Sequence, residues 1–137
     1  MLLSLDDEQR NVLHIACMAG STLIEFIVEQ AYNMQILQYI INAADELNQT
    51  PLYMLCVKGH QKKMVNGVYQ AHVYRHQFIK LLVKGQFSDE KKNQEYNIGK
   101  NPKNLAKWLV RISQIKYTPL HWLAYWNDYA SIDFLLD

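Results

Sequence analysis

The sequence lacks the features that mark membrane-spanning, secreted and nucleic-acid-binding proteins. None of its 137 residues belong to an uninterrupted apolar run near about eighteen residues, so we expect no direct membrane insertion. The opening, MLLSLDDEQR, has no basic region before its apolar residues and turns acidic at once, unlike a signal peptide. A formal net charge of only +1 argues against nucleic-acid binding.

Cysteine is scarce as well. Cys17 and Cys56 are the only two in the chain, and no secretory signal accompanies them. Such a count favours a reducing compartment, so we predict a cytoplasmic location.

Motifs for catalysis and metal binding are also missing. His72 and His76 have a spacing that places two side chains on one helix face. However, no HExxH glutamate lies between them and no cysteine pair is near, so helix-surface or partly buried histidines are the preferred interpretation. Gly59 and Gly99 are isolated and form no phosphate loop. We therefore predict no catalytic residue, no cofactor and no metal ion.

Three segments with one shared residue pattern are present instead. They start at Asn11, Thr50 and Thr118 and run NVLHIACMAG, TPLYMLCVKG and TPLHWLAYWN. Leucine stands two positions after each start, and a small residue stands six positions after it. Gly, Gly and Asn stand nine positions after it, and these residues tolerate left-handed backbone. Asp6 and Asp45 also precede the first two starts by five residues, so the agreement indicates an internal repeat.

TPLHWLA at 118–124 and TPLYMLC at 50–56 resemble the ankyrin repeat, and NVLHIAC at 11–17 is a weaker copy. The resemblance implies an all-α fold, a short helical-repeat solenoid of paired antiparallel helices joined by hairpin-like turns. It also implies a non-catalytic protein that binds another protein. At the histidine position of the motif, His14 and His121 would bond to backbone in the turn between units.

We therefore expect a single ankyrin-like repeat domain over 1–137. Its units are expected near 6–45, 45–85 and 101–137, with a polar loop over 86–102. The last apolar run reaches Asp137 without a helix stop signal, so we expect this domain to be part of a longer chain.

The spacing of the motifs departs from the family. Ankyrin repeats recur about every 33 residues, whereas the starts at 11, 50 and 118 are 39 and 68 residues apart. Lengthened helices and the long loop are the preferred explanation, and a degenerate extra repeat within 59–117 is the alternative. Residues 29–41 form either the continuation of one long helix or a separate helix. A further helix is expected over 103–112, after Pro102.

Cys17 and Cys56 occupy the same position in neighbouring copies of the motif. Packed helices would hold them about 8–10 Å apart, and a disulfide needs Cα atoms within about 7 Å. We predict two buried free thiols.

A partner-binding strip follows from the resemblance. In an ankyrin-like arrangement, the residues seven and eight after each start face a concave groove, and the residue four after it borders the groove. Trp and Tyr are common interface anchors. The predicted strip consists of Ile15, Met18, Met54, Val57, Lys58, Trp122, Tyr125, Trp126 and Tyr129. The alternative is that the chain's own insertions, or a following repeat, cover these residues.

Other positions of the third motif have a different expected role. Leu120, Leu123 and Ala124 should pack inward.

Together these features predict a protein-interaction or scaffold module. Two alternatives stay open: a structural portion of a large assembly, or a regulatory cytosolic domain of a larger enzyme or channel. The identity of the partner does not follow from the sequence.

Overall fold

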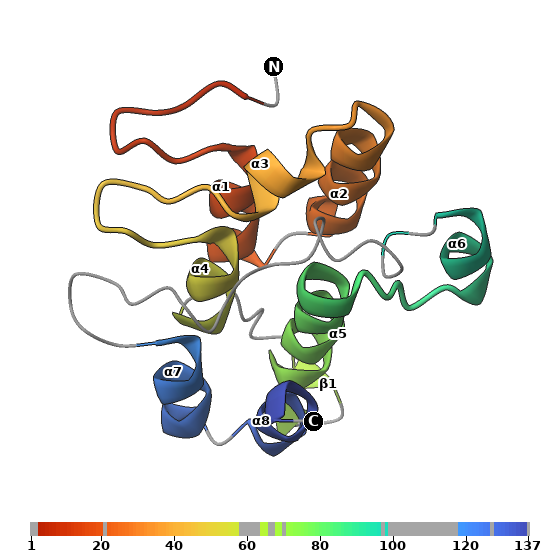
Figure 1. Ribbon diagram of the computed structural model, residues 1–137. Coiled ribbons are helices and arrows are strands. Elements are labelled where there is room, and N and C mark those ends of the chain that lie inside the picture. The colour runs from red at the N-terminus through yellow and green to blue at the C-terminus, as the bar shows by residue number, and fades with distance from the viewer. Residues whose placement is uncertain are drawn as a thin grey trace.

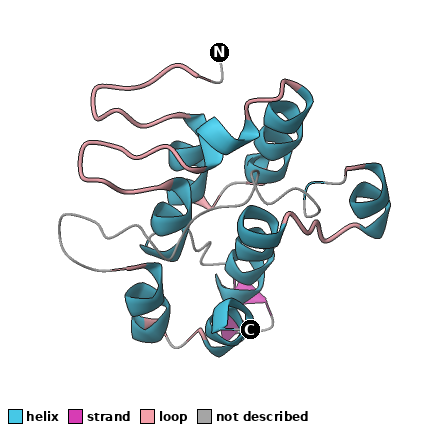
Figure 2. Cartoon of the chain, viewed as in Figure 1, coloured by secondary structure: helices cyan, strands magenta, loops and turns pink. Residues whose placement is uncertain are grey.

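The computed structural model describes residues 3–20, 22–57, 64–65, 68–69, 71–96, 98, 118–126 and 128–136. The helices within these ranges are α1 (Val12–Ala19), α2 (Leu23–Asn33), α3 (Leu37–Ile41), α4 (Pro51–Val57), α5 (Ala71–Lys84), α6 (Glu90–Glu95), α7 (Pro119–Tyr125) and α8 (Tyr129–Leu136). Two short strands, β1 (Met64–Val65) and β2 (Val68–Tyr69), form one antiparallel pair. Helices dominate the described part of the chain, as Figure 2 shows, and this agrees with the predicted all-α class.

The helices stand in two rows (Figure 1). α1, α4 and α7 pack on one another in chain order, and α2, α5 and α8 do the same in the second row. The rows are joined because α1 packs on α2, α4 on α5, and α7 on α8. The core lies between the rows, where Leu13, Ile24, Leu55 and Leu82 are fully buried. Each helix thus buries one apolar face against its neighbours.

Side chains cap the helices of the first row. At the start of α1, the Asn11 side chain accepts a hydrogen bond from the backbone N–H of His14 at 3.0 Å. The backbone N–H of Asn11 donates to Nδ1 of His14 at 3.1 Å. Thr118 and His121 form the same reciprocal pair at the start of α7. Such caps satisfy backbone groups that a helix end leaves unpaired.

One type of turn precedes both α1 and α4. The Asp6 carboxylate accepts hydrogen bonds from the backbone N–H groups two and four residues later, at 2.9 and 2.8 Å. Asp45 makes the same two bonds with the same lengths. The left-handed position is occupied by Gln9 in the first turn (φ 64°) and by Asn48 in the second (φ 60°). The two turns project side by side from the same edge (Figure 1), so the hydrogen bonds recur with the 39-residue spacing of the motif.

The structure settles the alternative for residues 29–41. α2 ends at Asn33, Gln35 adopts φ 60°, and α3 begins at Leu37. The segment forms two helices because the left-handed residue breaks the helical backbone between them.

The prediction of lengthened helices is wrong for the segment after α4. α4 ends at Val57, and β1 and β2 precede α5. The strand register pairs Val65 with Val68, which leaves the sequence Asn66-Gly67 between the strands. Asn-Gly is the dipeptide that two-residue hairpins favour, and valine suits a strand, so the sequence held a local signal for this hairpin.

The predicted loop over 86–102 is wrong in part, because it contains α6. The Asp89 side chain accepts a hydrogen bond from the backbone N–H of Lys91 at 3.0 Å and caps this helix. Ile98 is buried, so the described part of the segment packs against the rest of the protein. The helix expected over 103–112 lies outside the described residues.

Candidate protein-binding site

The members of the predicted strip in α1 differ in exposure. Ile15 is 43% exposed and borders a groove. Met18 is half-buried, and its sulfur accepts a hydrogen bond from Nη1 of Arg10 at 3.3 Å.

Met54 does not belong to an exposed surface. It is only 4% exposed, in a helix that packs against α1, α5 and α7. Its place in a partner-binding strip is therefore corrected to the interior. Val57, the last residue of α4, is half-buried, and Lys58 lies outside the described residues.

Trp122 takes part in the contact between α7 and α4. Its Nε1 donates a hydrogen bond to the hydroxyl of Tyr53 at 2.8 Å, which joins α7 to α4. Tyr53 stands at the histidine position of the second motif and is almost fully buried. The sequence did not single out this tyrosine, because its partner is 69 residues away.

The aromatic residues at the end of α7 and the start of α8 include the two most exposed side chains of the strip. Tyr125 is 70% exposed and Tyr129 is 78% exposed. The Tyr125 ring meets the half-buried Trp126 ring edge-on at 4.9 Å and the Trp122 ring at 5.8 Å. Edge-to-face pairs fix ring positions, so Tyr125 is held in place while most of its surface faces solvent.

The expected inward packing on α7 is only partly correct. Leu123 is fully buried and Leu120 is half-buried, but Ala124 is exposed. The side of α7 that holds Ala124 is therefore open to solvent.

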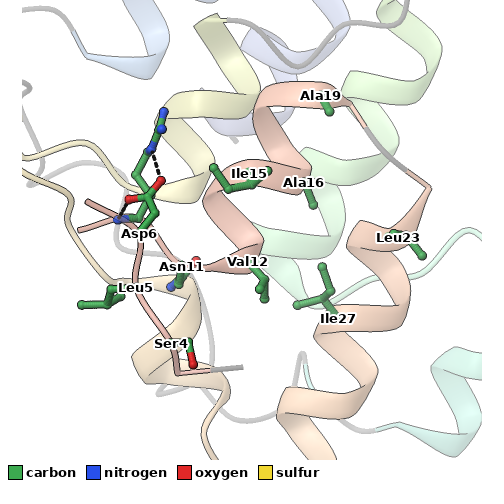
Figure 3. A pocket seen from close by; sticks show the side chains of 11 residues that line it. Ser4, Leu5, Asp6, Asn11, Val12, Ile15, Ala16, Ala19, Leu23 and Ile27 are labelled. Carbon is green, nitrogen blue, oxygen red and sulfur yellow. Dashed lines mark hydrogen bonds and ion pairs between the residues drawn. The ribbon is translucent and has the colours of Figure 1, made fainter. Parts of the chain in front are cut away.

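A groove lies between α1, α2 and the N-terminal segment (Figure 3). Its volume is about 510 Å³. The apolar side chains that line it on the two helices are Val12, Ile15, Ala16, Ala19, Leu23 and Ile27. Of these residues, only Ile15 is a member of the partner-binding strip that the motifs predict. An alignment of α1 with α4 could have indicated more of the groove residues. The equivalent positions of α4 lie on a face that packs against a neighbouring helix.

One edge of this groove is polar. Nε of Arg10 lies 2.9 Å from Oδ2 of Asp6. Hydrogen bonds from the backbone and side chain of Arg10 lower the pKa of the Asp6 carboxyl. The pair is held at the rim as an ion pair, so the groove combines an apolar floor with a charged edge.

His14 has a structural role. Its Nδ1 accepts from the backbone of Asn11, so Nε2 carries the proton and donates to the carbonyl of Gln49 at 2.8 Å. Burial lowers the pKa of His14, which favours this neutral form. The bond to backbone between units, which the resemblance implied, is present at His14. His76 contacts the hydroxyl of Ser131 at 3.3 Å.

The prediction for the two cysteines is confirmed. Cys17 and Cys56 are free and fully buried, and burial raises the pKa of both thiols. Buried, protonated thiols behave as small apolar groups in the core.

Two further features are absent from the described residues. These residues contain no group of three side chains placed to hold a metal ion. No helix in this part of the chain is long and apolar enough to cross a membrane.

The geometry thus offers two solvent-facing apolar features, the α7–α8 tyrosines and the α1–α2 groove. No protein-family model and no curated protein matches the sequence.

Proposed function

We propose that the chain is a non-catalytic protein-interaction module, built from three ankyrin-like helix pairs of a short solenoid. The two rows of helices support this proposal, as do the identical turns at Asp6 and Asp45. The ring nitrogens of His14 and His76 contribute to structural hydrogen bonds, which suits a scaffold rather than an enzyme. The free buried thiols suit a reducing compartment such as the cytoplasm.

The partner contacts this module through the tyrosines of α7 and α8. The observation that carries this step is the high exposure of Tyr125 and Tyr129 beside the half-buried Trp126. A fixed aromatic side chain loses little conformational freedom on binding, and tyrosine is a frequent energetic anchor of interfaces. Ile15, Met18 and Val57 extend the surface toward the other units.

A binding experiment tests this function. The full chain serves as bait in extracts of its native source, beside the double variant Tyr125→Ala/Tyr129→Ala. Both side chains are mostly exposed, so the variant should fold, and circular dichroism checks this. We expect the double variant to bind its captured partner about tenfold or more weakly, as loss of anchor residues predicts.

Tyr39→Ala is the matched control. Tyr39 is also an exposed tyrosine, 65% accessible, but it lies on α3. The proposal is wrong if the double variant binds as tightly as the unmodified chain, or if Tyr39→Ala weakens binding equally.

A structural role in an assembly is the second candidate. The observation in its favour is the exposure of large apolar side chains on α2, where Leu23 and Phe26 are more than half exposed. Apolar surface left open in this way marks contact sites. The mass of the native particle after gentle extraction distinguishes the candidates, because a structural subunit would remain in a large complex.

A further inference from the structure

The three helices of the first row have one face that points toward the preceding helix. The fourth residue after each motif start shows this: Ile15 in α1, Met54 in α4 and Trp122 in α7. Met54 is buried in α4, which packs on α1, and Trp122 bonds to Tyr53 of α4. Ile15 is the most exposed of the three, at 43%, and it borders the α1–α2 groove. We call this side of each helix the front face.

The opposite side of these helices faces the following helix at α4, where Tyr53 bonds to Trp122 of α7. It carries the sixth residue after each motif start: Cys17 in α1, Cys56 in α4 and Ala124 in α7. Cys17 and Cys56 are fully buried, whereas Ala124 is exposed. We call this side the back face. In the described structure, the front face is therefore open on α1 and the back face is open on α7.

The contacts within the chain show what each open face accepts. α1 packs on α4 and α4 packs on α7, and at the second contact Trp122 of the α7 front face bonds to Tyr53 of α4. The open back face of α7 is thus the equivalent of surfaces that already pack on a front face. The groove of Figure 3 contains the open front face of α1. It is the place where one more helix of the first row would pack.

We infer that the α1–α2 groove of one copy of this chain binds the open back face of α7 of a second copy. The contact extends the first row of helices from one molecule into the next. It joins two different surfaces, so it does not close on itself, and each added copy leaves another pair of faces open. It uses the faces between units rather than the α7–α8 tyrosines, and Ile15 is the residue that it shares with the proposed partner surface.

Two single substitutions test the contact by blocking one face each. Ala19→Glu places a carboxylate in the groove, and Ala124→Glu places one on the open back face. Both alanines are exposed, so both variants should fold, with circular dichroism as the check. Gln94→Glu is the control, because it adds the same charge at an exposed position of α6.

Sedimentation velocity over increasing concentration gives the result. We expect the unmodified chain and Gln94→Glu to form species beyond the dimer, and each alanine variant alone to remain a monomer. An equimolar mixture of the two alanine variants still has one intact groove and one intact back face. The mixture should form a dimer of one copy of each and nothing larger.

Three outcomes would overturn the inference. These are an unmodified chain that stays monomeric at all concentrations, a dimer that does not grow, and alanine variants that associate as the unmodified chain does. Failure here leaves the partner-binding experiment unaffected, because Tyr125 and Tyr129 are unchanged in every variant.

Discussion

At the scale of single residues, the ion pair between Arg75 and Asp128 has a large expected effect. Nε of Arg75 lies 2.8 Å from Oδ2 of Asp128, and each side chain is only 1% exposed. Asp128 also accepts a hydrogen bond from the backbone of Ser131, so the pair ties α5 to the start of α8. Removing one member of a buried pair leaves a charge without compensation in the core, which costs about 3–5 kcal/mol. Arg75→Met should therefore lower the free energy of unfolding by about this amount, as measured by urea denaturation.

The double variant Arg75→Met/Asp128→Leu separates the charge effect from packing. It strands no charge, so it should be more stable than Arg75→Met alone. A double variant that is less stable than the single one would contradict the role of the stranded carboxylate. Nothing local in the sequence marks this pair, because 53 residues separate its members and only the fold brings them together.

At the scale of elements, we expect aromatic rings to hold the segment around α6 on α2 more strongly than ion pairs do. The centroid of the Tyr96 ring lies 5.8 Å from that of Tyr32 in α2, and 5.7 Å from that of Phe87 in its own segment. Each such pair contributes about 0.5–1.5 kcal/mol beyond its buried area. Lys92 lies 3.3 Å and 3.2 Å from carboxylates of α2, but these side chains are partly exposed, and such pairs contribute about 0–1 kcal/mol.

Tyr96→Ala should therefore release this segment far more than Lys92→Gln. Amide hydrogen exchange of residues 86–96 measures the difference. We expect Tyr96→Ala to raise the exchange rate by about tenfold or more, and Lys92→Gln by less than about fivefold. The opposite order would show that charge anchors the segment.

The sequence of this element does not indicate a packed helix, for a physical reason. Its composition is polar and charged, which is typical of a loop, and α6 has only six residues. Phe87, Tyr96 and Ile98 are spread along the segment without helical spacing. Their burial depends on long-range packing, such as the contact of Tyr96 with Tyr32 of α2, that no local pattern contains.

At the scale of the whole molecule, the motif positions predicted the main features of the first row. Asn11 and Thr118 cap their helices, Gly20 ends α1 in the left-handed conformation, and the cysteines are buried. The identity of the exposed faces was harder to predict. Met54 and Ile15 hold the same motif position, yet one is buried and the other exposed, because α4 packs between α1 and α7 whereas Ile15 borders the open groove.

Leu13 and Leu52 show how this arrangement should distribute stability. Both are fully buried and stand at the same motif position, 39 residues apart. Leu-to-Ala substitution costs about 2–5 kcal/mol at such sites. α1 packs mainly on α4 and α2, whereas α4 packs on α1, α5 and α7. When each unit touches only its neighbours, a terminal unit can open while the others stay folded.

Leu13→Ala should therefore act locally, and Leu52→Ala should act on the whole stack. We expect Leu13→Ala to increase hydrogen exchange in α1 and α2 while α5 and α8 keep their protection. Leu52→Ala should increase exchange in all of these helices, because the central unit supports both sides. Equal loss of protection throughout the chain in both variants would mean that the helix pairs fold as one cooperative unit. Since the two substitutions remove the same atoms from equivalent sites, any difference between them reflects position in the stack.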